Sequence, residues 1–257
     1  MGTSAHPDVS AVILAAGKGT RMGSDLAKVL HPLAGQPLIA HVLETCRILG
    51  VGETVVVVGW QRAAVEAAVA PWHPRCVLQD RQLGTGHAVR VTEAAVSGRT
   101  VLVLCGDCPM TPPQLLDELL TRHRKSGAAC TGIAARMRDP SGYGRMIVDA
   151  QGRLSRIVEH KDATPEQRAI TLVNSGIYAF SRADLYRCLA AVTPNNSQGE
   201  YYLTDVVGML AAGGEGAELV VTDDVASVLG VNTPADLAQA ELLYAQRRRA
   251  GGAPAGA

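Results

Sequence analysis

The sequence predicts a doubly wound α/β fold, in which helices cover both faces of a largely parallel sheet. Three short runs of apolar, mostly β-branched residues occur at Val9–Leu14, Thr54–Val58 and Thr100–Leu104. Each run is continuous rather than alternating, which is typical of strands that are buried on both faces. Segments with helical spacing lie between the runs, and this order of strand and helix is that of βαβ units.

The first half of the chain contains three segments with helical spacing. Residues Leu38–Leu49 place apolar side chains on one face, and Gly50 ends this helix. The alanine-rich segment Gln61–Ala70 stops at Pro71. The segment 112–127 opens with two prolines, which suit a first helical turn, and closes with a glycine.

The second half is less regular. Residues 142–160 predict a hairpin with its turn at 150–152. Ser181 is expected to be the N-cap of a helix over 181–192. A last helix is expected at 233–249, with arginines at its C-terminal end, where positive charge suits the helix dipole.

Composition and charge bound the classes of function. The chain has 257 residues, 47% of them hydrophobic, which suffices for one large α/β domain or two small ones. Its 24 lysines and arginines balance 24 aspartates and glutamates. We therefore expect no nucleic-acid partner, because non-specific binding needs a basic face. Aromatic residues, at 4%, are too few for single-strand stacking platforms.

Cysteine usage and hydropathy indicate a cytoplasmic protein with reduced thiols. Six cysteines are too sparse for a disulfide scaffold in a chain of this length. The N-terminus has neither the basic region nor the long apolar region of a signal peptide. No apolar run approaches the ~20 residues of a membrane span, so no membrane partner is expected. We expect disorder at residues 1–8 and in the small, Gly- and Pro-bearing tail 250–257.

A loop rich in glycine and cations follows the first predicted strand. It reads Gly17-Lys18-Gly19-Thr20-Arg21, and Lys28 follows shortly after it. The N–H groups of such a loop can form an anion-binding nest, with Gly17 and Gly19 allowing close approach. It is neither a Walker A loop nor a dinucleotide fingerprint, because G-K-[ST] and the third glycine are missing. The alternative is a plain strand-to-helix turn with surface cations.

Six further motifs follow this loop. They are Gln82–Val89 (QLGTGHAV), Gly142–Arg145 (GYGR), Ile157–Thr164 (IVEHKDAT), Asn174–Tyr178 (NSGIY), Asn195–Asp205 (NNSQGEYYLTD) and Gly230–Leu237 (GVNTPADL). In this order, the loop and the motifs resemble the uridylyltransferase half of the bifunctional N-acetylglucosamine-1-phosphate uridylyltransferase/acetyltransferase family. These enzymes are sugar-1-phosphate nucleotidyltransferases. The resemblance covers roughly residues 9–245.

The resemblance implies a fold and a reaction. The fold is a Rossmann-like, three-layer nucleotidyltransferase fold with a mostly parallel mixed sheet over 9–232, an inserted sugar-binding β subregion at about 130–205, and the helix 233–249. The reaction is in-line attack of N-acetylglucosamine 1-phosphate on the α-phosphorus of UTP, with Mg²⁺, giving UDP-N-acetylglucosamine and pyrophosphate. Because both reactants are anions, catalysis is mainly positioning and charge neutralisation. A general base is hardly needed, since a phosphate monoester is already ionised near neutral pH.

A magnesium site is expected at the carboxyl end of the third strand. Asp107 lies just after this strand, where open α/β sheets bind ligands. By resemblance its partner ligand is Asn232. The alternatives are a turn aspartate before Pro109 and a turn asparagine before Pro234.

Arg21, Lys28 and Asp107 form the expected catalytic set. Arg21 can fork onto the β- and γ-phosphates of UTP, and Lys28 would steady the phosphate that undergoes substitution. Lys18 lies in the same loop and is expected to point to solvent.

The remaining substrate positions are implied by the resemblance alone. Those that contact the uridine are Ala15, Ala16, Gly17, Gln79, Gly84 and Thr85, and Leu14, Gly19, Thr20, Cys105 and Gly106 are further substrate-binding positions. For the sugar they are Gly144, Glu159, Asn174, Tyr202 and Thr204. For Gly84 and Gly86 a simple turn is the alternative, and for the neighbouring tyrosines 201 and 202 it is packing.

The sequence departs from the family in two ways. Cys105 stands where the family usually has an aromatic residue, which gives the run CGDC. A zinc or redox role for Cys105 and Cys108 is disfavoured, because no second C-x-x-C and no histidine at ligand spacing accompany them. The hexapeptide-repeat acetyltransferase half does not follow, so we expect no acetyltransferase activity. A stand-alone enzyme and a truncated one both fit, and the oligomeric state stays open.

Two other functions stay open. One is the same reaction with another sugar, such as glucose or N-acetylgalactosamine 1-phosphate. The other is a sugar-nucleotide-binding module without turnover, which should lack Arg21, Lys28 or Asp107; all three are present.

Overall fold

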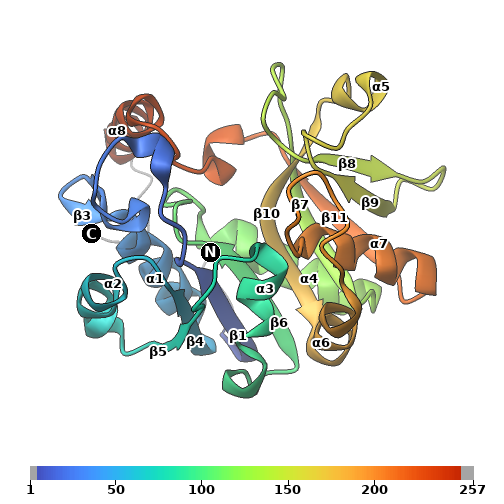
Figure 1. The fold of residues 1–257 in the computed structure, drawn as a ribbon, viewed down its shortest axis with the longest axis horizontal. Coiled ribbons are helices and arrows are strands. Elements are labelled where there is room, and N and C mark those ends of the chain that lie inside the picture. The colour runs from blue at the N-terminus through green and yellow to red at the C-terminus, as the bar shows by residue number, and fades with distance from the viewer. Residues whose placement is uncertain (1–4, 250–257) are drawn as a thin grey trace.

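The computed structural model describes residues 5–249 as helices on both faces of one large sheet (Figure 1). Seven strands follow one another in the order β11-β7-β10-β6-β1-β4-β5. Strands β1, β4, β5 and β6 are parallel, and β11 is parallel to β7, whereas β10 runs antiparallel to β6 and β7. The bounds are β1 His6–Leu14, β4 Val51–Val58, β5 Arg75–Leu78, β6 Thr100–Cys105, β7 Cys130–Arg136, β10 Leu172–Ser181 and β11 Ala217–Thr222. The predicted mixed, mostly parallel sheet is confirmed.

Two helical layers bury the two faces of this sheet. One layer consists of α1 (Leu38–Leu49), α2 (Arg62–Val69) and α4 (Pro113–Ser126), and the other of α3 (Thr85–Arg90), α6 (Arg182–Ala191) and α7 (Leu203–Gly213). Alternate side chains of a strand pack against opposite layers: in β6, Leu102 packs against the first layer and Val101 against the second. This double burial explains why the strand sequences are continuously apolar.

Strand β1 begins earlier than the sequence predicts. Residues 6–8 were expected to be disordered, and this is wrong. The His6 side chain is fully buried, its Nε2 lies 2.8 Å from Asp117 Oδ1, and its backbone N–H donates to Gly50 O at 2.8 Å. These contacts order a segment that lacks an apolar pattern. Residues 1–4 and 250–257 lie outside the described part of the chain.

The second half contains the predicted hairpin and two predicted helices. Strands β8 (Arg145–Val148) and β9 (Leu154–Val158) are antiparallel, and β8 also pairs with β10. Helix α6 starts directly after Ser181, as predicted, but the Ser181 side chain makes no capping hydrogen bond to the backbone. Helix α8 (Pro234–Arg249) matches the predicted last helix. The shorter elements are β2 Pro32–Leu33, β3 Gln36–Pro37 and α5 Pro165–Arg168.

Helix α8 braces segments that precede and follow the central strands. Glu241 Oε1 accepts a hydrogen bond from Ala34 N at 2.9 Å, in the β2–β3 turn. Arg247 Nη1 donates to Met110 O at 2.8 Å, just after β6. Tyr244 packs edge-on against the His41 ring of α1, with ring centroids 5.2 Å apart. Helix α8 therefore packs near the edge of the sheet that is uppermost in Figure 1.

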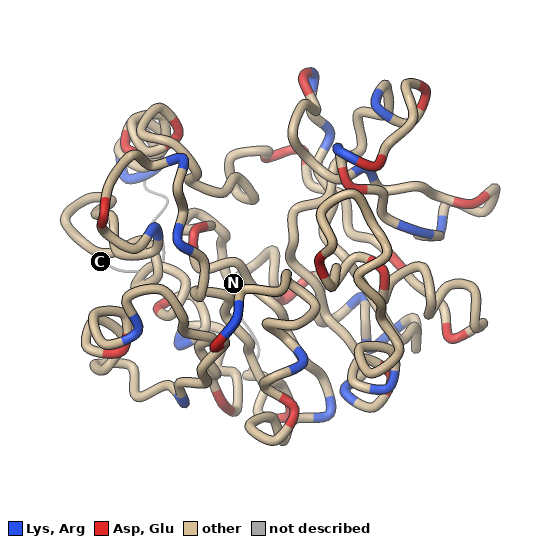
Figure 2. Tube along the Cα trace, in the orientation of Figure 1, with Lys and Arg blue, Asp and Glu red and all other residues tan. Residues whose placement is uncertain are grey.

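The 24 lysines and arginines and the 24 aspartates and glutamates include residues of both signs on all sides of the trace in Figure 2. Within residues 5–249, the helices are all too short or too polar to cross a bilayer.

Candidate functional site

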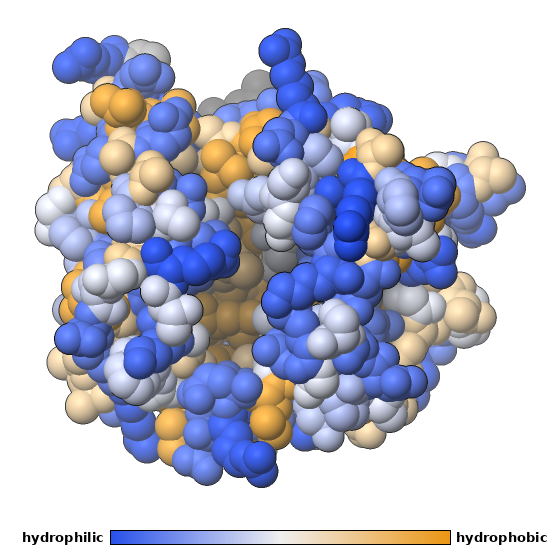
Figure 3. All heavy atoms as spheres, turned by 45° about the horizontal axis from the view of Figure 1, so that its top comes forward, coloured by the Kyte–Doolittle hydropathy of each residue, from blue (hydrophilic) through white to orange (hydrophobic). Residues whose placement is uncertain are grey.

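A cavity of about 310 Å³ opens where the parallel strands end. Figure 3 brings this edge of the sheet toward the viewer and shows a hollow with a more hydrophobic floor between hydrophilic rims. The cavity contains ten predicted site residues, from the ends of β1, β5 and β6, from η2 (Lys28–Leu30) and from the start of α3: Leu14, Ala15, Ala16, Gly17, Lys28, Gln79, Gly84, Thr85, Cys105 and Asp107. The carboxyl edge of an open α/β sheet is where ligands of such folds bind.

The loop after β1 is shaped around Lys28. Gly19 has φ +67°, and a Cβ built there would lie 2.5 Å from Lys28 Cβ. Only glycine fits, because both the backbone conformation and the space exclude a side chain. Thr20 opens the short helical turn η1 (Thr20–Met22). Lys18 is exposed, as predicted, and its Nζ lies 4.4 Å from the centroid of the Trp60 ring.

Four predicted residues meet beside this loop. Lys28 Nζ forms an ion pair with Asp107 Oδ2 and donates to Asn232 Oδ1 at 3.0 Å. Arg21 Nη2 donates to the same Asn232 oxygen at 3.0 Å. Asp107 O accepts from Val231 N at 2.9 Å, which fixes the Asn232 segment against the end of β6. Residues more than 200 positions apart thus form one polar cluster.

Two of these four residues, Asp107 and Asn232, can hold a divalent cation. The carboxylate of Asp107 and the amide oxygen of Asn232 converge on one point, which the Lys28 ammonium group contacts. Carboxylate and amide oxygens are the ligands that Mg²⁺ accepts in proteins, together with waters and phosphate oxygens. The donor set therefore fits the predicted metal site.

Gly106 and Cys105 bring β6 close to its neighbours. Gly106 N donates to Leu14 O at 3.0 Å, and a Cβ on Gly106 would lie 3.0 Å from that oxygen. Cys105 Sγ lies 3.7 Å from Gly176 O of β10. The small side chain at position 105 thus contacts the strand that carries Asn174.

The sulfur atoms of Cys105 and Cys108 and a carboxylate oxygen of Asp107 all lie within 4.8 Å of one another. A thiol binds zinc as the thiolate. A hydrogen bond with Cys105, burial and the Asp107 charge raise the pKa of the Cys108 thiol well above its ordinary value. These surroundings keep the proton on the Cys108 sulfur in the metal-free protein. That Cys105 and Cys108 have no zinc role stays a prediction from the sequence.

The wall formed by residues 79–86 is built on backbone contacts. Gln79 is buried, and its Nε2 donates to Gly84 O at 3.1 Å. Gly84 has φ +107°, and a Cβ there would lie 2.6 Å from Tyr201 O. Gly86 N donates to that same oxygen at 2.7 Å, and Thr85 Oγ1 accepts from Leu203 N at 3.1 Å. The two glycines therefore do more than form a turn, because they let this wall pack against the segment before α7.

The predicted sugar residues form a second cluster, with Gly144 just before β8, Glu159 just after β9, Asn174 on β10 and Thr204 on α7. Asn174 N donates to Gly144 O at 2.9 Å. Thr204 Oγ1 donates to Glu159 Oε1 at 3.2 Å, and a Cβ on Gly144 would lie 3.4 Å from Glu159 Oε2. Asn174 Oδ1 accepts from the Tyr178 hydroxyl at 2.7 Å, while its Nδ2 has no hydrogen-bond partner among residues 5–249. A carboxylate oxygen and an amide N–H are thus available to a hydroxyl-bearing ligand.

Two residues of this cluster, Glu159 and Tyr202, have distinct surroundings. Burial raises the pKa of Glu159, the Thr204 hydrogen bond opposes that shift, and the charges of Asp162, Asp205 and Glu200 add to it. Tyr202 belongs to another network: its hydroxyl accepts from Gln198 Nε2 at 2.6 Å and donates to Asp162 Oδ2 at 3.3 Å.

The sequence reasoning missed four residues that line the cavity, namely Val29, Gln82, Ala88 and Glu200. Gln82 and Ala88 lie inside the motif Gln82–Val89, and Glu200 lies inside Asn195–Asp205, so those motifs carried the signal. For Val29, only its position next to Lys28 in the sequence could have indicated that it lines the cavity.

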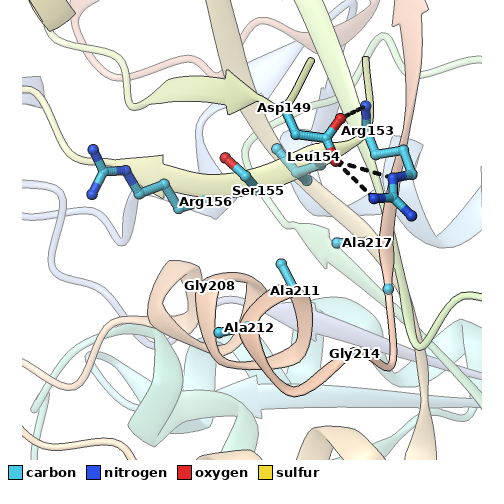
Figure 4. Close-up of a pocket in the computed structure, with 11 residues that line it drawn as sticks. Asp149, Arg153, Leu154, Ser155, Arg156, Gly208, Ala211, Ala212, Gly214 and Ala217 are labelled. Atoms are coloured by element: carbon cyan, nitrogen blue, oxygen red, sulfur yellow. Dashed lines mark hydrogen bonds and ion pairs between the residues drawn. The ribbon is translucent and has the colours of Figure 1, made fainter. Parts of the chain in front are cut away.

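A larger hollow of about 460 Å³ lies between the β8–β9 hairpin and α7 (Figure 4). Arg153 pairs there with Asp149 at 3.0 Å, while Gly208, Ala211 and Ala212 of α7 form the opposite wall. It contains none of the predicted site residues. Size alone therefore does not identify the candidate site, whereas the convergence of cations, carboxylate and amide does.

The chain is similar to several known proteins. The MobA-like NTP transferase domain family matches residues 11–202. The bifunctional protein GlmU of Pelobacter propionicus is 46% identical over 243 residues, which cover 93% of this chain and 53% of that protein. GlmU of Desulfotalea psychrophila is 44% identical over 239 residues, covering 92% and 70%. The chain spans about half the length of GlmU from Pelobacter propionicus and from Syntrophomonas wolfei.

A solved structure of CMP:2-keto-3-deoxy-manno-octonic acid synthetase with CTP matches with a TM-score of 0.70 and 21% identity, covering 93% of this chain and 99% of that one. This likeness shows the fold. The family match covers most of the chain, and the relatives reach this identity over nearly all of it. The protein therefore belongs to the MobA-like NTP transferase domain family, alongside the GlmU proteins.

Proposed function

We propose that this protein is a uridylyltransferase that makes UDP-N-acetylglucosamine and pyrophosphate from UTP and N-acetylglucosamine 1-phosphate. The observation that carries the proposal is the meeting of Arg21, Lys28, Asp107 and Asn232 at one point beside the cavity. Bringing two anions together requires such a concentration of positive charge and metal ligands. The family and the GlmU relatives support the same class of reaction.

Each member of this cluster has a role that its contacts suit. Arg21, a guanidinium with two parallel donors, binds the outer phosphates of the nucleotide. Lys28 steadies the phosphate that is substituted, since its stem is held in place by Gly19 and the loop around it. Asp107 and Asn232 hold the divalent cation, proposed to be Mg²⁺, which supplies further charge neutralisation when it is bound.

The two walls of the site select the two substrates. The backbone of Ala15–Gly17 and the Gln79–Thr85 wall can match the carbonyl and N–H edge of uracil, because both present main-chain groups at a cavity surface. Gly144, Glu159, Asn174 and Thr204 face the other reactant, the sugar. Cys105 lies between the walls, through its contact with Gly176.

A pyrophosphate-release assay with UTP, Mg²⁺ and a panel of sugar 1-phosphates tests the proposal. We expect turnover that needs all three components and is fastest with N-acetylglucosamine 1-phosphate. Faster turnover with glucose or N-acetylgalactosamine 1-phosphate would reassign the sugar. Nucleotide binding without pyrophosphate release from any sugar would indicate a binding module and contradict the proposal. The cytoplasmic location expected from the sequence stays a prediction.

A further inference from the structure

Gln61 adopts a backbone conformation that is unusual for its residue type. It lies between β4 and α2 with φ 49° and ψ 40°, in the left-handed region. A residue other than glycine pays about 1 kcal/mol or more to stay there, and such strain persists only where other contacts enforce it. The contacts of its side chain show what enforces it.

The Gln61 side chain reaches back to the segment that leads into Lys28. Its Oε1 accepts from Ala27 N at 2.9 Å, and its Nε2 donates to Asp25 O at 2.7 Å. Ala27 is fully buried and directly precedes Lys28 in η2. One amide group therefore satisfies both a donor and an acceptor of a loop that is otherwise largely exposed at residues 23–26.

The turn that carries Gln61 is itself fixed to the anion loop. Trp60 N donates to Ala16 O at 3.0 Å, and a Cβ on Gly59 would lie 2.8 Å from that oxygen. The start of the loop at Ala16 and its end at Ala27 are thus both held by the three residues 59–61. On the other side, Gly19 contacts the stem of Lys28.

We propose that Gln61 is a positioning residue, whose side-chain amide fixes the backbone before Lys28 and so places the Lys28 ammonium group at the reacting phosphate. This inference rests on the proposed uridylyltransferase function. Gln61 acts on the polar cluster indirectly, since its side-chain amide is hydrogen-bonded to Asp25 O and Ala27 N. Its effect must therefore appear in the reaction rate more than in substrate affinity.

Two variants separate positioning from a merely structural role. Gln61→Gly removes both hydrogen bonds but also relieves the left-handed strain, so the two effects oppose each other and the melting temperature should change little. Gln61→Met keeps a side chain of similar length and the strain, but also loses both hydrogen bonds. Both should lower kcat by about 10- to 100-fold with KM for UTP and sugar phosphate unchanged, because small misplacement of a reacting group has effects of this size.

His73→Gly is the matched control. His73 is an exposed residue, also in the left-handed region with φ 51°, two residues before β5, and it does not line the cavity. It should keep the wild-type kcat. Wild-type kcat in both Gln61 variants, or an equal loss in His73→Gly, would overturn the inference. Absence of pyrophosphate release by the wild-type protein would instead overturn the proposed function, so the two failures are distinguishable.

Discussion

Replacing Glu159 by glutamine separates the role of this side chain in binding from its effect on the fold. Glu159 Oε1 already accepts a hydrogen bond from Thr204, at 3.2 Å. No described residue donates to Oε2, which lies over Gly144. This oxygen is the one that a sugar hydroxyl can reach. Glutamine keeps the size of the side chain but presents one neutral acceptor and one N–H group instead.

The expected loss follows from that one charged hydrogen bond. A hydrogen bond to a charged group contributes about 1.5–3 kcal/mol, so Glu159→Gln should raise KM for the sugar phosphate about tenfold to a hundredfold, with KM for UTP unchanged. Steady-state pyrophosphate release, with each substrate varied in turn, measures both. Glu118→Gln, an exposed residue of α4, is the control and should change neither.

Glu159→Gln should weaken sugar binding, but it should stabilise the folded protein. Burial raises the pKa of Glu159, so the folded protein binds this proton more tightly than the unfolded chain does. The cost of ionising it is absent below the ordinary glutamate pKa, grows as pH rises toward the folded-state pKa, and is constant above that. Glu159→Gln should therefore raise the melting temperature at neutral pH, with a smaller gain in acid. A sugar KM that stays unchanged, or a lower melting temperature at neutral pH, would refute this reasoning.

Three further predictions concern the polar cluster and its thiols. Asp107→Asn should reduce metal-dependent turnover by about a hundredfold or more, and near-normal rates in Mg²⁺ would contradict the metal assignment. Lys28→Ala should lower kcat more than it weakens UTP binding, whereas Lys18→Ala should keep the wild-type kcat; a pure KM effect at Lys28 would show a different role. The double variant Cys105→Ser/Cys108→Ser should retain activity, and elemental analysis should detect no zinc in the wild-type protein as purified; zinc that is lost in the variant would support a metal role.

The local parts of the site could be predicted from the sequence because their signals are local. Gly17, Gly19 and Arg21 are neighbours in the chain, and the apolar run before them identifies the strand that presents them. Asp107 was identifiable because it follows a continuous apolar strand directly. Its pairing with Asn232 needed the family resemblance, since 125 residues separate the two and no spacing rule connects them.

Two features had no sequence signal for physical reasons. Strand β10 runs antiparallel in the middle of a mostly parallel sheet, and its pairing with β7 shifts register between Asn174 and Tyr178. That interruption, at Asn174-Ser175-Gly176, breaks the apolar pattern of a buried strand. Gln61 was placed inside a predicted helix, whereas it is the N-cap of α2, and its partners lie 34 and 36 residues earlier.

The dependence of the polar cluster on Asn232 has a consequence for the timing of biosynthesis. Asn232 and the brace formed by α8 come from the last part of the described chain, while Arg21 and Lys28 come from its beginning. While the chain is still on the ribosome, the early strands can form, but Arg21 and Lys28 lack their Asn232 partner until residue 232 has emerged. Such contacts between distant residues form late, so partly synthesised chains should be inert even where their sheet has already folded.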